Sequence, residues 1–243
     1  MHNYYKGVVA AAMMAPALVL AAQPSAILGQ ELAATAAKGS VNVDFYNVIP
    51  NISNANSAAY GGGNNHPALR VGALDGEVFV TNQVHSDSYQ IGYKRVLSQG
   101  PQGRQKGAAP VNVALYGGLG VDTPPNPSTN DKTVLTLGAA IDYRATPWLL
   151  NMNPRIEDDG TDSWTDIVLG AFYTVANSGA SKALLLGAEV DLAVDTPAGI
   201  KKENISRLGV RWVPTDNVTF DFVVYDSSSG LQVPGLMRVN IGF

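Results

Sequence analysis

The best candidates for chemistry are found in the stretch QVHSDS, where His85 precedes Ser86, Asp87 and Ser88. A serine, a histidine and an acid together can activate a hydroxyl group as a nucleophile for hydrolysis. Such a triad is defined by its geometry in the folded protein, however, and serine and aspartate are also the usual residues of polar turns. We therefore predict a turn here and no catalytic residue, with hydrolysis as the less favoured alternative.

No metal or cofactor site is predicted either. The acidic run EDDGTDSWTD at residues 157–166 lacks the spacing of a calcium-binding EF-hand loop. The stretch GGLG at 117–120 lies inside an alternating segment and opens no helix, so it does not have the context of a phosphate-binding loop. The chain has no cysteine, which excludes disulfides and thiolate-ligated metals.

Charged residues fall instead on one of the two alternating faces of long segments. In VTFDFVVYD (218–226), Phe220 and Phe222 fall on one face of an extended strand and Asp221 on the other. Successive side chains of a strand point to opposite faces, so each segment has an apolar row and a polar row. The charged residues that we assign to the polar rows are Arg70, Lys94, Asp142, Arg144, Arg155, Asp166, Glu189, Asp191, Arg207, Arg211, Asp221 and Arg238.

The strands that carry these rows are unusually long. Several alternate over about nine to eleven residues, which is longer than an ordinary strand and matches a tilted strand that crosses a membrane. Glycine, alanine and threonine accompany the charges on the polar rows, as suits a barrel interior. The predicted fold is all-β, a closed antiparallel transmembrane β-barrel of about twelve strands, with ten or fourteen as alternatives. The predicted strands are 40–49, 68–74, 77–84, 88–97, 111–121, 133–143, 148–155, 164–175, 183–194, 205–213, 218–226 and 236–243.

The connections between these segments alternate in length. LDGE (74–77), RATP (144–147) and PTDN (214–217) are tight, whereas PNISNANSAAYGGGNNHPA (50–68) and PRIEDDGTDS (154–163) are long. Short turns at one end and long loops at the other are typical of membrane barrels, with both chain termini at the short-turn end. One connection, QGPQGRQKGAA (99–109), is long where a short turn is expected. Aromatic residues lie near the predicted strand ends, as in an interfacial girdle: Tyr89, Tyr143, Trp148, Trp164, Tyr173, Trp212, Tyr225 and Phe243.

The last strand, LMRVNIGF (236–243), places Met237, Val239, Ile241 and Phe243 in one row and ends on the aromatic residue. In this feature the chain resembles Gram-negative outer-membrane β-barrel proteins, although Gly242 departs from their usual pattern. The resemblance implies that the barrel-assembly machinery reads these four residues as a signal. It also implies a location in the bacterial outer membrane, in contact with lipid and lipopolysaccharide.

The chain is predicted to divide into three parts. Residues 1–22 have the build of a secretory signal peptide, with Lys6 before an apolar stretch that ends near Ala22, although a single anchoring helix is the alternative. Residues 23–39 form a periplasmic lead-in whose alanine content would allow a helix. Residues 40–243 form the barrel.

The net charge and the charged rows then limit the classes of function that the chain could have. A net charge of −4 without a basic cluster argues against nucleic acid as a partner. If lipid meets the apolar rows, the charged rows line the lumen, where they would form a small passive channel for solutes. In the alternative, they pair with one another or with the 23–39 lead-in and close the lumen, which gives a structural or adhesive barrel. An outer-membrane lipid hydrolase and a soluble exported β-sandwich or ligand-binding barrel are less favoured.

Overall fold

The computed structural model describes residues 26–27, 30–48, 65–82, 89–98, 111–122, 132–145, 147–178, 181–196, 204–227 and 232–243. The strands are β1 (Ala26–Ile27), β2 (Gln30–Glu31), β3 (Val41–Val48), β4 (Asn65–Ala73), β5 (Gly76–Asn82), β6 (Tyr89–Ser98), β7 (Val111–Asp122), β8 (Lys132–Ala145), β9 (Trp148–Asp158), β10 (Ser163–Ser178), β11 (Ser181–Asp195), β12 (Ile205–Thr215), β13 (Val218–Asp226) and β14 (Gln232–Gly242). Within these ranges there is no helix with the length and apolar character needed to cross a membrane.

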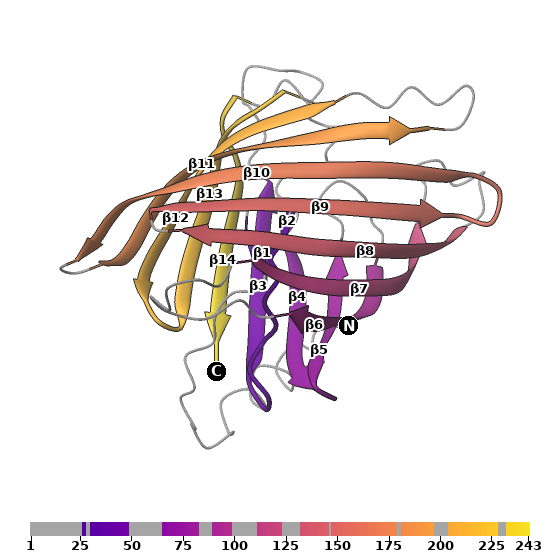
Figure 1. Cartoon of the computed structure of the whole chain (residues 1–243), viewed down its shortest axis with the longest axis horizontal. Helices are drawn as coiled ribbons and strands as arrows, with labels where there is room; N and C mark the ends of the chain where they lie inside the picture. The colour runs from indigo at the N-terminus through magenta and orange to yellow at the C-terminus, as the bar shows by residue number, and fades with distance from the viewer. Residues whose placement is uncertain are drawn as a thin grey trace.

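Twelve of these strands, β3 to β14, form a closed antiparallel barrel (Figure 1). Each strand pairs with its neighbours in sequence, and β14 pairs with β3 to complete the cylinder. At this seam the terminal Phe243 donates its N–H to the carbonyl of Val41 at 2.8 Å and accepts the N–H of Val41 at 3.1 Å. The predicted all-β class, the closed antiparallel barrel and the number of about twelve strands are therefore confirmed.

The two ends of the barrel differ in the length of their connections. At the short-turn end lie the last residues of β14 and the first residues of β3, together with the strand ends that 74–75, 99–110, 146–147, 179–180 and 216–217 join, of which only 99–110 is long. At the long-loop end lie the strand ends that 49–64, 83–88, 123–131, 159–162, 196–204 and 227–231 join. The tight β4–β5 turn has Leu74 and Asp75 both at positive φ, 52° and 59°, the combination that matches the twist of a two-residue hairpin.

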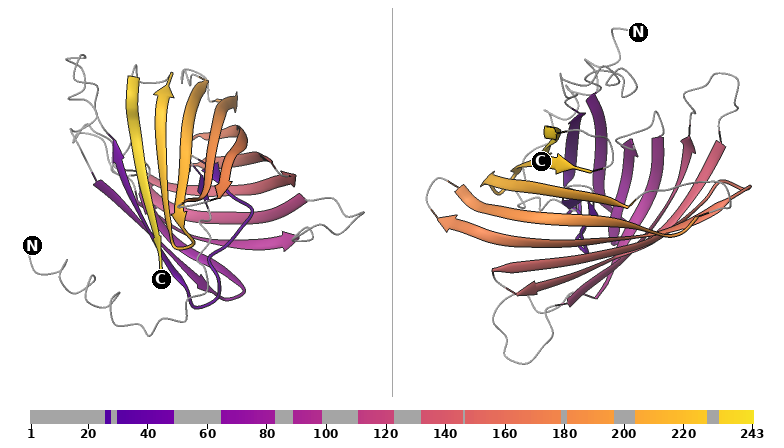
Figure 2. Two further views of the ribbon diagram at one scale, coloured as in Figure 1. Left: turned by 90° about the vertical axis from the view of Figure 1, so that its left-hand side faces the viewer. Right: turned by 90° about the horizontal axis from the view of Figure 1, so that it is seen from above.

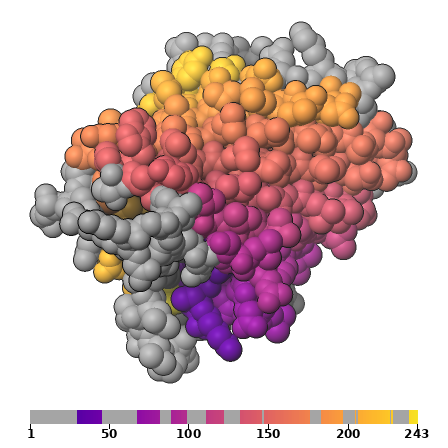
Figure 3. Space-filling view, viewed as in Figure 1, coloured from indigo at the N-terminus to yellow at the C-terminus, as the bar shows by residue number. Residues whose placement is uncertain are grey.

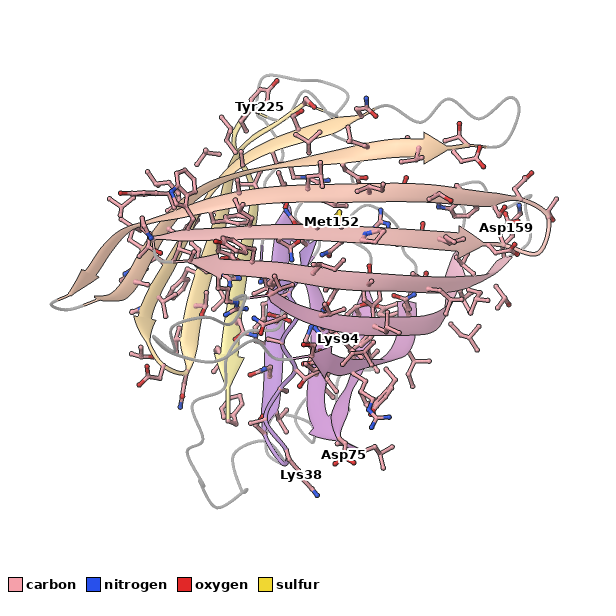
Figure 4. All side chains as sticks on the ribbon, in the orientation of Figure 1. Lys38, Asp75, Lys94, Met152, Asp159 and Tyr225 are labelled. Carbon is pink, nitrogen blue, oxygen red and sulfur yellow. The ribbon has the colours of Figure 1, made fainter. Side chains whose placement is uncertain are left out.

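The connection between β9 and β10 is shorter than its acidic composition suggests. Strand β9 continues to Asp158 and β10 begins at Ser163, so only 159–162 of the predicted loop 154–163 connects them. The acidic residues support a tight turn here, because Asp159 accepts the N–H groups of Thr161 at 2.9 Å and Asp162 at 2.8 Å. Its other carboxylate oxygen pairs with Lys132 of β8, and this contact lowers the pKa of Asp159 to about 2. Figure 4 places Asp159 at the tip of this hairpin.

Side chains alternate sharply across the barrel wall. Leu137 and Leu186 are 55% and 48% exposed, whereas Lys94 and Asp142 are fully buried at 0%. The outer surface over the middle strands is continuous in the space-filling view (Figure 3). The large apolar side chains exposed on β7 to β11 are mostly leucine, isoleucine and valine. Charged side chains fill the inner rows.

The N-terminal segment is not a barrel strand. Strands β1 and β2 pair only with each other in the described structure, through Ala26–Glu31 and Ile27–Gln30. The alanine-rich lead-in contains no helix between residues 30 and 39, in contrast to what its composition would allow. The N–H groups of Glu31, Ala33 and Ala36 donate to side chains of the wall, and these contacts hold the segment extended in place of helical bonds.

Candidate functional site

Residues 30–40, which we call the inner segment, run through the interior of the barrel. Figures 1 and 2 show β1 and β2 enclosed by the barrel strands. Polar contacts of the segment reach β4, β5, β6, β8, β9 and β11. A single stretch of chain can touch inward side chains of so many strands only from within the cylinder. The lumen is therefore occupied by the protein's own N-terminal chain.

Glu31 is the electrostatic centre of these contacts. Its carboxylate accepts two hydrogen bonds from Arg70, at 2.5 Å from Nη2 and 3.0 Å from Nη1, and one from Lys94 Nζ at 2.7 Å. Arg70 comes from β4 and Lys94 from β6, and both side chains are buried. Burial alone would raise the pKa of Glu31, but the two cations outweigh it and lower the pKa to about 2.

Two further carboxylates of the wall hold these cations in place. Glu77 of β5 accepts a hydrogen bond from Arg70 Nη1 at 2.8 Å and lies 3.4 Å from Lys94 Nζ. Asp44 of β3 lies 3.4 Å from Arg70 Nε. The Arg70 guanidinium also sits over the ring of Phe79, 5.5 Å from its centroid. Arg70 is thus fixed on several sides, and its fork is oriented toward Glu31.

The backbone of the inner segment is also bound by the wall. Asn151 and Asn153 of β9 both donate to the carbonyl of Glu31, at 3.0 and 2.9 Å. Asn153 Oδ1 accepts the N–H of Glu31 at 2.7 Å, and Asp142 Oδ2 accepts the N–H of Ala33 at 3.0 Å. Wall side chains therefore satisfy backbone groups that a strand would give to a neighbouring strand.

Small residues of the wall make room for the segment. Leu32 packs against Phe172 and Val223. A Cβ at Gly170 would lie 2.3 Å from Gln30 Nε2, and one at Gly72 would lie 1.9 Å from the carbonyl oxygen of Ala37. The inner face of the wall is thus shaped to the segment as well as charged for it.

The remaining lumen charges pair along the wall. Arg211 forks onto Asp221 at 2.6 and 2.7 Å, and Arg238 binds the same carboxylate at 2.7 Å. Elsewhere, the predicted lumen residues pair as follows: Arg207 with Glu189 at 2.7 Å, Arg155 with Asp166 at 3.2 Å and with Asp191 at 3.5 Å, and Arg144 with Asp142 at 2.9 Å. Most of these pairs link neighbouring strands across the barrel ladder, whereas Arg144 and Asp142 both lie on β8 and the Arg155–Asp191 pair spans from β9 to β11.

The structure thus brings most of the predicted polar-row residues into ion pairs inside the barrel. Arg144 is the most exposed of them, with 39% of its side chain accessible near the short-turn end. Residues that the sequence reasoning missed include Glu31, Glu77 and Asp44. Asp44 could have been found, because VNVDF alternates clearly, whereas EVFVTNQV around Glu77 alternates poorly and Glu31 precedes the barrel.

The predicted assembly residues lie on β14 and at the chain end. Val239 and Ile241 pair with Phe220 and Val218 of β13, and Phe243 is exposed at the short-turn end. Nothing is described of the Met237 side chain. Among the described residues no group of three histidine or acidic side chains could hold a metal ion. His85 lies outside the described residues, and only the backbone of His66 is described, in β4.

Comparison of the sequence with protein-family models, with curated proteins and with solved structures finds no match.

Proposed function

We propose that this chain is an outer-membrane β-barrel of a Gram-negative bacterium that offers small solutes a passage, closed at rest by the inner segment. Its surroundings are then lipid and lipopolysaccharide, and residues 1–22 direct its export. The barrel-assembly machinery recognises the row that ends at Phe243.

The outer surface supports the membrane part of the proposal. Large apolar side chains such as Leu115 of β7, Leu137 of β8 and Ile156 of β9 stand exposed on successive strands, far more than a water-facing surface usually carries. Aromatic side chains gather at the short-turn end, where Trp148 and Tyr173 meet edge to face at 5.0 Å. Such an apolar band with an aromatic border is the pattern of a barrel in lipid.

The contacts that hold the inner segment in the lumen support the proposed passage. The wall ladder from β3 to β14 is complete without it. Apart from the contacts of residues 38–40 with Gly72, the described polar contacts of the segment with the wall run through wall side chains. The segment can therefore leave the lumen without breaking a barrel strand, which a gate requires.

The second candidate is a barrel that stays closed and serves a structural role. The dense ion pairing of the lumen favours it, because charges such as Arg211 and Asp221 already satisfy one another. The two candidates differ in a single respect, namely whether displacement of the segment opens a path.

A reversible lock distinguishes them. Ala33 packs with Ala140 of β8, and the chain has no cysteine, so Ala33→Cys with Ala140→Cys introduces one defined disulfide. The pair is combined with Glu31→Gln, which weakens the hold of Arg70 and Lys94 on the segment. In liposome swelling with graded sugars, we expect no permeation when the pair is oxidised and permeation of the smallest sugars after reduction. No permeation in either state, with correctly folded barrel, would favour the structural role.

The membrane location is tested separately. We expect the protein in the outer-membrane fraction of cells, extracted only by detergent, with a gel mobility that shifts on boiling. Recovery in the soluble periplasmic fraction would contradict the proposal, whatever the swelling assay gives.

A further inference from the structure

We infer that Arg70 and Lys94 form a binding site for small organic carboxylates, which Glu31 occupies while the lumen is closed. The inference rests on the proposed displacement of the inner segment and names the class of solute that would compete with it.

The geometry around Glu31 is that of a bound carboxylate ligand. Arg70 presents both terminal nitrogens to the two oxygens, at 2.5 and 3.0 Å, and Lys94 adds a third donor at 2.7 Å. A planar fork opposite a carboxylate gives two parallel charge-assisted hydrogen bonds, which fix orientation as well as charge. The site thus selects a planar anion over a neutral solute of the same size.

The cations belong to the wall and the anion does not. Arg70 and Lys94 are 2% and 0% exposed and lie on barrel strands, whereas Glu31 arrives on the displaceable segment. When the segment leaves, Glu77 and Asp44 remain, and Asp44 is also 3.8 Å from Arg238. Arg70 and Lys94 then lose one carboxylate partner and face the lumen. An incoming carboxylate can restore the charge-assisted hydrogen bonds that Glu31 made, so it is favoured to take that place.

The side-chain amides of Asn151 and Asn153 indicate a second polar group that the ligand should carry. Asn151 and Asn153, which bind the backbone carbonyl of Glu31, become available beside the cationic pair when the segment leaves. A carboxylate that carries a carbonyl or hydroxyl group a few bonds away would satisfy them as Glu31 does. Short dicarboxylates and acylated acidic amino acids have this arrangement.

The test measures whether a carboxylate displaces the segment in the full-length protein. Ala36→Cys places one thiol at a buried position of the inner segment, in a chain without other cysteine. The rate of maleimide labelling in proteoliposomes then reports how often the segment is free. We expect glutarate to raise this rate saturably by at least about tenfold, because it competes for the cations that hold Glu31. Glutaramide, the neutral analogue, at matched ionic strength should leave the rate unchanged.

Two variants assign the effect to the site. Lys94→Gln should raise the rate without ligand and lose most of the response to glutarate. Arg155→Gln, which removes a lumen cation that pairs with Asp166 and Asp191 instead of the segment, should keep the response. Equal responses to glutarate and glutaramide, or a full response in Lys94→Gln, would overturn the inference.

A direct binding measurement guards against poor folding of the Lys94 variant. Glu31→Gln leaves both cations in place and weakens the internal competitor, so calorimetry in detergent should show glutarate binding about 30- to 100-fold tighter than in the wild type. Equal or weaker binding would refute the site. If glutarate does not bind more tightly but reduction of the Ala33–Ala140 disulfide still opens the lumen, the carboxylate site is refuted and the proposed passage stands. If the lock has no effect on permeation, it is the proposed passage that fails.

Discussion

Replacing Glu31 by glutamine should free the inner segment, and the structure sets the size of the effect. The pKa of Glu31 falls from 4.5 to about 2 in the docked state, a difference that corresponds to about 3 kcal/mol of interaction with its surroundings. Removal of one partner from a buried ion pair gives a similar figure, about 3–5 kcal/mol. The lower end applies, because 20% of the Glu31 side chain remains accessible.

A change of about 3 kcal/mol shifts an equilibrium by roughly two orders of magnitude. Glutamine keeps an oxygen that Arg70 or Lys94 can bind, so we expect the free population to rise by about 30- to 100-fold. The assay is the rate of maleimide labelling at Ala36→Cys, which is proportional to the free population when the segment moves faster than it is labelled.

A matched control separates this effect from a general loosening of the barrel. Asp166 is also a buried lumen carboxylate, but it pairs with Arg155 of the wall at 3.2 Å. Asp166→Asn should therefore change the labelling rate by less than about threefold. A rise of less than threefold in Glu31→Gln, or an equal rise in both variants, would refute the account of how the segment is held.

Because the folded pKa of Glu31 is depressed from 4.5 to about 2, its contribution to closure is complete above pH 4.5 and is lost as the pH falls through 2. Planar-bilayer recordings should show openings that increase below about pH 4 in the wild type, and Glu31→Gln should lack this component. Leu186→Arg, on the outer face of β11, should reduce the free energy of unfolding in lipid by about 2–4 kcal/mol. Leu74→Arg, in the exposed β4–β5 turn, should leave it almost unchanged, and equal values by urea titration would argue against lipid contact. Gly72→Ala should displace the segment, because its Cβ would lie 1.9 Å from the Ala37 carbonyl oxygen. Gly118→Ala, whose Cβ would meet the flexible Gln90 side chain instead, is the control, and equal labelling at Ala36→Cys would contradict the proposed fit.

Much of the wall could be predicted from the sequence because a strand with two different environments has to alternate. All twelve barrel strands overlap the predicted segments. The tight turn predicted at LDGE (74–77) is also present, with Leu74 and Asp75 as its two central residues in the left-handed conformation. The strand ends were harder to predict. Glu157 and Asp158 look like a solvated loop by composition, yet they continue β9, because Glu157 faces inward and binds Trp164 across the β9–β10 pair.

The inner segment could not be predicted in the same way. Its contacts join Glu31 to Arg70, Lys94 and Asn153, which are far apart in sequence and meet only after the barrel has closed. Alanine-rich composition gives a local preference for helix. Hydrogen bonds from the wall to extended backbone overcome that preference, and no local pattern in residues 30–39 announces them.

The most direct test of the account is disulfide formation at the centre of the lumen, measured on the full-length protein. Ala33→Cys should cross-link almost completely on oxidation to Ala140→Cys, whose side chain is buried on the inner face of β8. It should not cross-link to Leu137→Cys, which is exposed on the outer face of the same strand. Cross-linking to the outer position, or to neither, would contradict a barrel that holds its own N-terminal segment inside.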